Sequence, residues 1–138
     1  MIEKQTIVLE TKAGTDIIDI TPNVSEILAK SKINSGMVCI FVPGSTASIS
    51  TLEYEPNLVK DVKRALEKIA PEKGEYDHHK TWGDDNGFSH VRACLLKPGL
   101  SVPFENKKLI LGTWQNITLL DFDTKDRERK IIVQIIGE

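Results

Sequence analysis

The chain begins with two short runs in which β-branched and aliphatic residues predominate. These runs cover residues 6–10 and 16–20, and Ala13-Gly14 lies between them. Branched side chains favour an extended backbone, and a glycine between two such runs is typical of a tight turn. We therefore expect the fold to open with two paired strands that form a hairpin.

Two later segments carry apolar residues at the spacing of a helix. The first follows Thr21-Pro22, which suits an N-cap and a first helical position, and ends near residues 34–36. The second begins at Pro56. The apolar positions are Val24, Ile27 and Leu28 in the first segment and Leu58, Val62, Leu66 and Ile69 in the second. This periodicity predicts two helices that pack one face each on a sheet.

The remaining apolar runs are short, and turn residues such as Pro98-Gly99 and Glu105-Asn106 separate them. The pattern predicts strands with antiparallel neighbours. The predicted strands cover residues 37–42, 45–52, 91–96, 100–104, 109–111, 114–122 and 130–136. Because strands outnumber helices, we predict an α+β fold, a mainly antiparallel pair of sheets with two packed helices, in a single domain over residues 1–138.

Composition narrows the classes of function. With 18 basic and 20 acidic residues the net charge is −2, so the chain lacks the broad positive field that nucleic-acid binding needs. No apolar run approaches the ~20 residues that cross a bilayer, and the polar start differs from a signal peptide. We therefore expect a cytoplasmic protein without nucleic-acid or membrane partners. Cys39 and Cys94 lie in separate apolar runs, which predicts buried free thiols.

A long polar connection carries the most distinctive chemistry of the chain. Residues 76–92 contain all three histidines and the adjacent pair Asp84-Asp85. The connection over residues 71–89 exceeds the ~12–15 residues at which an unstructured loop becomes unusual in a compact domain. Such loops are commonly functional, so we predict that this one holds the site. For His79, which precedes Lys80, we expect an exposed side chain.

His78 and His90 lie at opposite ends of this connection, so a loop that folds back brings the two imidazoles together. Imidazole serves as a metal ligand or as a proton carrier, and the spacing matches no standard zinc pattern. Asp84 and Asp85 point to opposite sides of an extended chain, but the turn after them can present a carboxylate to magnesium. Side-chain capping of that turn is an equally good interpretation.

Further residues are candidates for binding an anion or a ring. Arg92 follows His90 by two positions, so on a strand both side chains share one face. Ser45 and Thr46 offer hydroxyl groups, and Trp114 can cover a flat aromatic ring. The structural alternatives are a solvated arginine, an exposed hydroxyl-rich strand and a core tryptophan.

A small basic cluster lies near the end of the chain. It consists of Arg127, Arg129 and Lys130 in a predicted hairpin. Such a cluster is commonly a solvated tip, but its charges also attract phosphate. Both interpretations stay open at this point.

Several separated motifs resemble those of the YjbQ-like family. In chain order they are Tyr76-x-His78, Asp84-Asp85, Ser89-His90-Val-Arg92, Val102-Pro103 and Gly112-Thr-Trp-Gln115, before an Ile/Val-rich strand that ends at Gly137-Glu138. The resemblance runs nearly end to end. It implies an α+β protein with an antiparallel β-sandwich that assembles as a homotrimer, with a site near the subunit boundaries.

The resemblance also implies secondary thiamine-phosphate synthase activity. In this transferase reaction a pyrimidine-methyl diphosphate joins a thiazole phosphate and releases diphosphate, which calls for a divalent metal, Mg or Zn, or for cationic groups. The implied metal ligands are His78, His90, Asp84, Asp85 and Glu53. The implied catalytic residues are His90, His78 and Asp85, and the implied substrate-binding residues are Arg92, Ser45, Thr46, Trp114 and Gln115.

Two positions depart from the family pattern. Family members commonly carry histidine where this chain has Gly44 and Phe88. A three-histidine zinc site cannot be assembled from His78 and His90 alone. The alternatives are therefore a non-catalytic trimeric module that binds a small anionic metabolite, and a phosphate-ester hydrolase.

Overall fold

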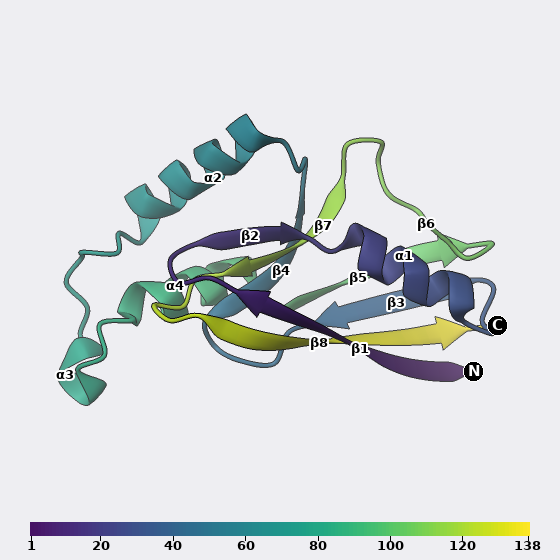
Figure 1. Ribbon diagram of the computed structural model, residues 1–138, viewed down its shortest axis with the longest axis horizontal. Helices are drawn as coiled ribbons and strands as arrows, with labels where there is room; N and C mark the ends of the chain where they lie inside the picture. The colour runs from purple at the N-terminus through teal and green to yellow at the C-terminus, as the bar shows by residue number, and fades with distance from the viewer.

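The computed structural model describes all 138 residues, which form two antiparallel sheets and four helices. The strands are β1 (Ile2–Thr11), β2 (Asp16–Asp19), β3 (Gly36–Phe41), β4 (Ala47–Leu52), β5 (Gly99–Glu105), β6 (Lys108–Leu109), β7 (Asn116–Asp121) and β8 (Arg127–Gly137). The helices are α1 (Thr21–Lys30), α2 (Pro56–Ile69), α3 (His79–Trp82) and α4 (Gly87–Leu96). One sheet has the strand order β1-β8-β3-β5-β6 and the other β2-β7-β4 (Figure 1).

The two sheets pack face to face around one main apolar core. In β8 of the larger sheet, Ile131, Val133 and Ile135 alternate with more exposed residues and are fully buried. They share this core with Ile49 of β4 and Leu119 of β7, which belong to the smaller sheet. Because alternate side chains of a strand point to one face, the inner faces of both sheets form a sandwich. The predicted α+β fold with antiparallel sheets is confirmed.

The first two strands do not form the hairpin that the sequence predicted. β1 pairs with β8, whereas β2 pairs with β7 in the other sheet. The turn at Gly14 carries the chain from one sheet to the other, and the Gly14 N–H donates to the carbonyl oxygen of Asp123 at 3.1 Å. The prediction was wrong because a turn signal marks a change of direction and does not identify which strands become neighbours.

Both helices predicted from apolar spacing are present. α1 buries Val24 and Leu28 in the main core. The carboxylate of Glu55 caps α2, because it accepts hydrogen bonds from two N–H groups of the first turn. α2 buries Leu66 against the smaller sheet and leaves its other faces largely exposed.

The strand predicted over residues 91–96 is instead part of helix α4. This helix packs on β4, and its Ala93 joins a second apolar cluster with Leu120 and Phe122. Leu119 lies in the main core, so Leu120 and this cluster belong to the outer face of the smaller sheet. A short apolar run fits a buried helix as well as a strand, which is why hydrophobicity alone gave the wrong element. With α3 and α4, the fold has four helices rather than two.

Three smaller features also differ from the predictions. The strand expected over residues 109–111 is reduced to the two residues of β6, and Trp114 precedes β7. Both cysteines are free, but Cys94 is exposed and Cys39 is only partly buried, so the prediction of two buried thiols was wrong. No helix has the length and apolar character that a membrane crossing requires.

Candidate functional site

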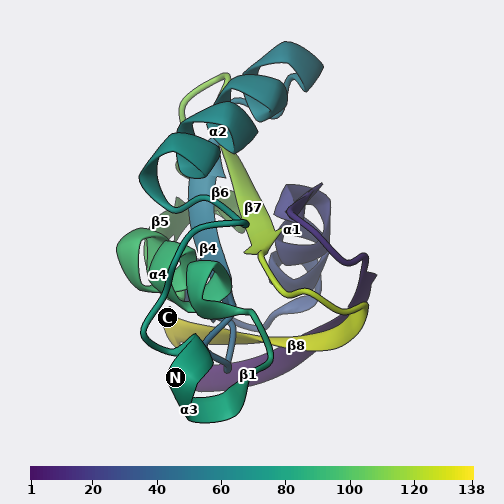
Figure 2. The ribbon, with the colours of Figure 1, turned by 90° about the vertical axis from the view of Figure 1, so that its left-hand side faces the viewer.

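An open cavity of about 400 Å³ is lined in part by residues from the region of α3 and α4. Figure 1 shows this region at the end of the sandwich away from both termini, and Figure 2 views the molecule from that end. Three separate parts of the chain line the cavity: the β3–β4 connection, the region of α3 and α4, and the β7–β8 turn together with the start of β8. The lining residues are Gly44, Ser45, Thr46, His78, Trp82, Asp84, Asn86, His90, Asp123, Arg127 and Arg129. Nearly all of them are polar, which suits a ligand rich in hydrogen-bonding groups.

The β3–β4 connection brings a run of unpaired backbone amides to the cavity. Gly44, Ser45 and Thr46 all line the cavity, and none of their backbone N–H groups donates to an acceptor within the chain. Gly44 has a φ of +131°, a conformation that other residues rarely adopt. Consecutive free N–H groups of this kind are a typical oxyanion-binding feature. Ser45 and Thr46, predicted as substrate-binding residues, are therefore at the cavity.

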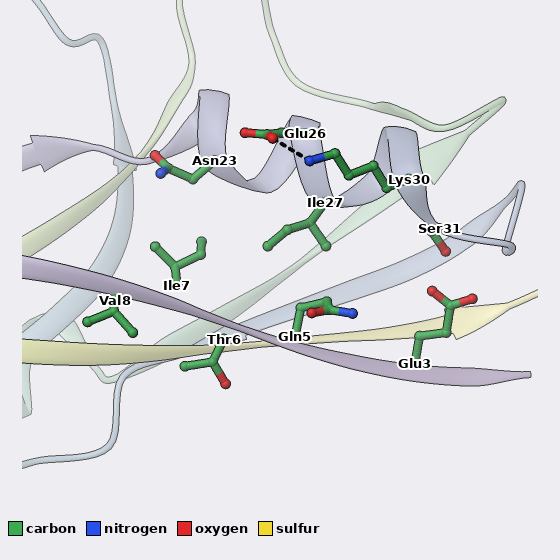
Figure 3. A pocket seen from close by; sticks show the side chains of 10 residues that line it. All are labelled: Glu3, Gln5, Thr6, Ile7, Val8, Asn23, Glu26, Ile27, Lys30 and Ser31. Carbon is green, nitrogen blue, oxygen red and sulfur yellow. Dashed lines mark hydrogen bonds and ion pairs between the residues drawn. The ribbon is translucent and has the colours of Figure 1, made fainter.

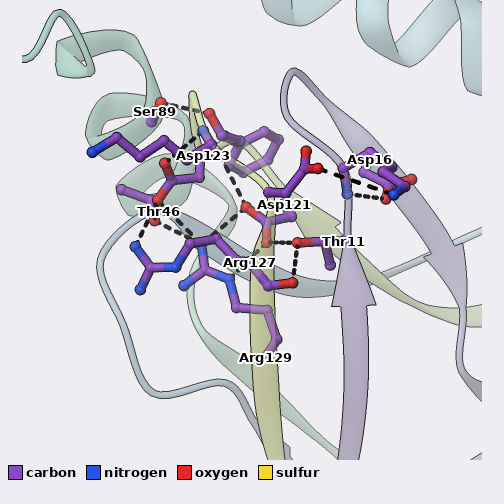
Figure 4. A network of polar contacts seen from close by, with 12 residues as sticks. Thr11, Asp16, Thr46, Ser89, Asp121, Asp123, Arg127 and Arg129 are labelled. Atoms are coloured by element: carbon purple, nitrogen blue, oxygen red, sulfur yellow. Dashed lines mark hydrogen bonds and ion pairs between the residues drawn. The ribbon is translucent and has the colours of Figure 1, made fainter.

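A buried ion-pair network holds Arg129 beside these amides (Figure 4). Its Nε donates to Oδ2 of Asp121 at 2.6 Å, while Nη2 donates to Oδ1 at 2.9 Å and to the Thr46 hydroxyl at 2.7 Å. Burial raises the pKa of Asp121. Hydrogen bonds from Arg129, from Thr11 and from the backbone N–H of Asp123, with the guanidinium charge, outweigh burial and hold this pKa below its ordinary value. The carboxylate is therefore charged at neutral pH and fixes the guanidinium in place.

Two arginines keep donor groups that no acceptor in the chain uses. Nη1 of Arg129 has no acceptor and lies 3.0 Å from the position that a Cβ on Gly44 would occupy. Arg127 is half-exposed and donates only from Nη1, to Asp123 at 3.2 Å. The two arginines are balanced by the carboxylates of Asp121 and Asp123. The region therefore offers directed donors rather than a net positive charge.

The structure brings His78 and His90 together at the cavity. His78 immediately precedes α3 and His90 lies in α4, and their ring centroids are 4.7 Å apart at an interplanar angle of 67°. Trp82 at the end of α3 and the carboxylate of Asp84 line the same cavity. Two imidazoles in contact can share a proton or a ligand group.

The adjacent aspartates do not face the same space. Asp84 lines the cavity, whereas Asp85 is exposed, has a φ of +54°, and places Oδ1 3.6 Å from Nδ1 of His79. His79 is mostly buried, and its Nε2 accepts the N–H of Gly87 at 3.2 Å. This bond satisfies an amide at the start of α4 and anchors the loop. The prediction of an exposed His79 was wrong, because its polar neighbours did not reveal the bond to α4.

Arg92 lies outside the cavity because its segment is helical. Residues two positions apart in sequence are separated by roughly 200° around a helix. Arg92 and His90 therefore face opposite sides of α4 instead of sharing one face of a strand. Arg92 is 2% exposed. It donates to the Ala70 carbonyl oxygen at 2.9 Å and to the side chains of Glu67 and Thr15, each at 2.8 Å. Its guanidinium therefore joins α4 to the end of α2 rather than binding an anion beside His90.

The two positions that depart from the family pattern have different surroundings. Gly44 lines the cavity, as described above. Phe88 is buried, and the Cζ of Arg92 lies 5.0 Å from the centroid of its ring. Position 88 therefore contributes to the packing of α4 and not to the cavity wall.

Three predicted site residues lie at the opposite end of β4. Thr46 precedes this strand and Glu53 follows it, so the two are roughly 20 Å apart at ~3.3 Å per residue. Nε2 of Gln115 donates to Oγ1 of Thr51 at 3.2 Å near this far end. Trp114 is 72% exposed. Glu53, Trp114 and Gln115 are thus absent from the cavity lining.

The chain does not gather the ligands expected for a divalent metal. No group of three or more His, Cys, Asp or Glu side chains lies close enough together to hold a metal ion. His78 and His90 meet, but Glu53 is at the far end of β4 and Asp85 is beside His79. The donor set of one chain therefore does not fit magnesium or zinc, and we assign no metal to the cavity.

Some lining residues were missed by the sequence analysis. The motifs Asp121-Phe-Asp123 and Arg127-Glu-Arg129 each place like charges two positions apart, at the end of β7 and at the start of β8, the next strand along the chain. That spacing puts both charges of a pair on one face, so acidic partners for the basic cluster could have been predicted. Trp82 and Asn86 carry no such signal. The buried Oδ1 of Asn86 has no hydrogen-bond partner within the chain.

Comparison with known sequences shows a match over almost the whole chain. A family model described as "UPF0047 protein YjbQ-like" matches residues 5–138. A UPF0047 protein of Methanothermobacter thermautotrophicus is 37% identical over 97% of this chain and 92% of its own length. The UPF0047 protein YugU of Bacillus subtilis is 32% identical over 96% of this chain and 98% of its own length.

Solved structures show the same fold. A YbjQ-like protein of unknown function from Sulfolobus solfataricus has a TM-score of 0.88 and 32% identity, with 100% of both chains covered. A hypothetical protein from Aeropyrum pernix has a TM-score of 0.91 and 26% identity, with 99% of both covered. These comparisons contradict the expected secondary thiamine-phosphate synthase function, because they give the family no established function. The chain belongs to the YjbQ-like UPF0047 family.

Proposed function

We propose that this chain binds a small phosphorylated metabolite in the cavity between the β3–β4 connection and the β7–β8 turn. The observation that carries the proposal is the run of free N–H groups at Gly44, Ser45 and Thr46 beside the unused Nη1 of Arg129. A phosphate group accepts several hydrogen bonds at once and pairs well with guanidinium groups. The donors at this corner match that requirement.

The buried network makes these donors available in a fixed arrangement. Asp121 and Thr46 hold two edges of the Arg129 guanidinium, so its position does not depend on the ligand. A group that is already ordered loses less entropy when it binds. Arg127, which is half-exposed, can add a more adaptable contact at the rim.

The cavity has room for more than a phosphate group. Its volume of about 400 Å³ lies within the ~300–1,000 Å³ typical of sites for small organic molecules. His78, His90 and Trp82 line it and offer imidazole and indole surfaces. These rings are the surfaces that we assign to the organic part of the metabolite.

Calorimetry with simple probes tests the proposal. We expect saturable binding of glycerol 3-phosphate and of inorganic phosphate, and no binding of glycerol, which lacks the phosphate group. Arg127→Ala is expected to weaken binding of both phosphate probes by about tenfold, the loss of one charge-assisted contact. Arg64→Ala is the matched control, because Arg64 is an exposed arginine of α2 that pairs only with Asp61.

Two results of these titrations would contradict the proposal. If neither phosphate probe binds at millimolar concentration, or if Arg64→Ala weakens binding as much as Arg127→Ala, the cavity is not a specific phosphate site.

A further inference from the structure

Every second residue of the segment 82–86 lines the cavity. Trp82, Asp84 and Asn86 contribute to its wall, whereas Gly83 and Asp85 between them do not. Both intervening residues have a left-handed backbone, with a φ of +67° for Gly83 and +54° for Asp85. Such a backbone is uncommon for a residue other than glycine, and residues that adopt it cluster at binding sites. The segment therefore forms one continuous wall of the cavity, built from three alternate side chains.

The carboxylate of Asp84 is the one acidic group of this cavity that has no ion-pair partner within the chain. Asp84 is exposed. The other lining carboxylate belongs to Asp123, which accepts the Thr46 hydroxyl at 2.9 Å and Nη1 of Arg127 at 3.2 Å. Asp84 thus adds a negative charge to the cavity wall that no cation of the chain neutralises.

Its neighbours in the segment favour the same kind of ligand group. The buried Oδ1 of Asn86 has no hydrogen-bond partner, and rotation of this amide brings the oxygen to a ligand in the cavity. A buried acceptor without a donor destabilises the folded chain, so a ligand that supplies an N–H removes that penalty. Trp82 is 73% exposed, and the face of an indole attracts a cation. A positively charged group with N–H donors satisfies all three residues.

The groove between β1 and α1 shows the contrasting arrangement (Figure 3). This groove of about 380 Å³ also has two carboxylates in its lining, but each of them already has a donor. Glu26 accepts from Nζ of Lys30 at 2.6 Å, and Glu3 accepts the backbone N–H of Lys32 at 2.9 Å. The carboxylates of this groove are therefore satisfied within the chain, whereas that of Asp84 is left for a ligand.

We propose that the metabolite carries a protonated amine in addition to its phosphate group, and that Asp84 binds the ammonium group. This inference rests on the proposed phosphate site at Gly44, Ser45 and Thr46. The phosphate site and the segment 82–86 come from separate parts of the chain and line one cavity, so a single small molecule can contact both. Asp84 is then the residue that distinguishes an aminoalkyl phosphate from a phosphate ester without an amine.

Phosphoethanolamine and propyl phosphate test the inference, because they match in size and a methyl group replaces the ammonium group in the second probe. Calorimetry is done at pH 8 in the presence of EDTA, where the amine is protonated and no metal bridges the phosphate to a carboxylate. We expect the wild-type chain to bind phosphoethanolamine about tenfold more tightly than propyl phosphate, the gain from one charge-assisted contact.

Two adjacent aspartates provide the variant and its matched control. Asp84→Asn keeps the shape of the side chain and removes its charge, so the preference for phosphoethanolamine is expected to fall from about tenfold to about twofold or less. Asp85→Asn makes the same change at the next residue, which lies beside His79 outside the cavity. This control is expected to keep the preference of about tenfold.

The results separate this inference from the proposed phosphate site. Binding of both probes with equal affinity by the wild-type chain would overturn the ammonium contact and leave the phosphate site in place. A preference that survives in Asp84→Asn, or that falls equally in Asp84→Asn and Asp85→Asn, would remove Asp84 from this role. Failure of the wild-type chain to bind either probe at millimolar concentration would contradict both proposals.

Discussion

The two ends of β4 carry similar residue types but differ in what surrounds them. At the near end, the Thr46 hydroxyl is buried, accepts a bond from Arg129 and donates one to Asp123. At the far end, Gln115 bonds Thr51 at the surface. The sequence predicted site residues at both ends of β4. The difference shows that polar residues form a binding site only where burial fixes their positions and some donors are left unused.

The largest expected effect is at the near end. Asp121→Asn removes the carboxylate that Arg129 bonds in a buried setting and leaves only the more distant Asp123, 3.7 Å from Nη2, to balance the guanidinium. We expect a loss of about 3–5 kcal/mol in the free energy of unfolding, together with loss of phosphate binding. Urea unfolding measures the first effect and calorimetry the second. If Gln115→Ala at the far end lowered the free energy of unfolding and the phosphate affinity by as much as Asp121→Asn, the proposed difference between the two ends would be contradicted.

The same carboxylate predicts sensitivity to acid. Its pKa in the folded protein lies below the ordinary value of 3.8, so the unfolded chain binds the proton more readily. The stabilisation by Asp121 is therefore complete above its unfolded pKa and is lost as the pH falls through the folded value. Unfolding free energies measured from about pH 5 down to pH 2 should fall more steeply in the wild type than in Asp121→Asn. Parallel slopes would show that this carboxylate does not titrate as described.

Gly44→Ala is expected to have the next largest effect. The substitution places a Cβ 3.0 Å from Nη1 of Arg129 on a backbone with a φ of +131°. Strain of about 1–3 kcal/mol and displacement of the guanidinium should weaken phosphate binding. Gly14→Ala is the matched control, because Gly14 has a φ of +90° but no atom within 4 Å of the added Cβ. Equal phosphate affinity of the Gly44→Ala and Gly14→Ala variants would show that Gly44 is not part of the phosphate site.

The two tryptophans give the smallest and most closely matched comparison. Trp82 is 73% exposed and lines the cavity, whereas Trp114 is 72% exposed near the far end of β4. Trp82→Ala is expected to weaken binding of an aromatic phosphate, with phenyl phosphate as the probe, by about threefold to tenfold and to leave inorganic phosphate binding unchanged. Trp114→Ala should change neither. Both should alter the free energy of unfolding by less than about 0.5 kcal/mol.

The fold class was predictable because hydrophobic periodicity reports burial. Val24 and Leu28 marked α1, and the Ile/Val-rich run over residues 130–136 marked β8. The pairing of strands was not predictable, since β1 and β2 join different sheets and long-range contacts leave no local signal. The short apolar run within α4 was compatible with both a strand and a helix.

The contacts of the site were predictable only where the course of the nearby chain determined which side chains could meet. His78 and His90 meet because a loop that returns on itself must bring its ends together. The expected pairing of His90 with Arg92 failed because it depended on a strand that is a helix. Glu53 and Trp114 lie outside the cavity for another reason, since β4 carries the chain away from it. The spacing of Asp121-Phe-Asp123 and Arg127-Glu-Arg129 favours contact between the two pairs, but it does not give the individual bonds of Arg129 to Asp121, because β7 and β8 lie in different sheets and their relative position depends on how the sheets pack.

The most direct measurement is an amide NMR titration of the isotope-labelled wild-type chain with glycerol 3-phosphate. We predict saturable shifts at residues 44–46 and at Arg127 and Arg129, with no change at Trp114 or Gln115. Shifts that cluster around residues 114–115, or that leave residues 44–46 unmoved during saturation, would contradict the assignment of the phosphate site to the near end of β4.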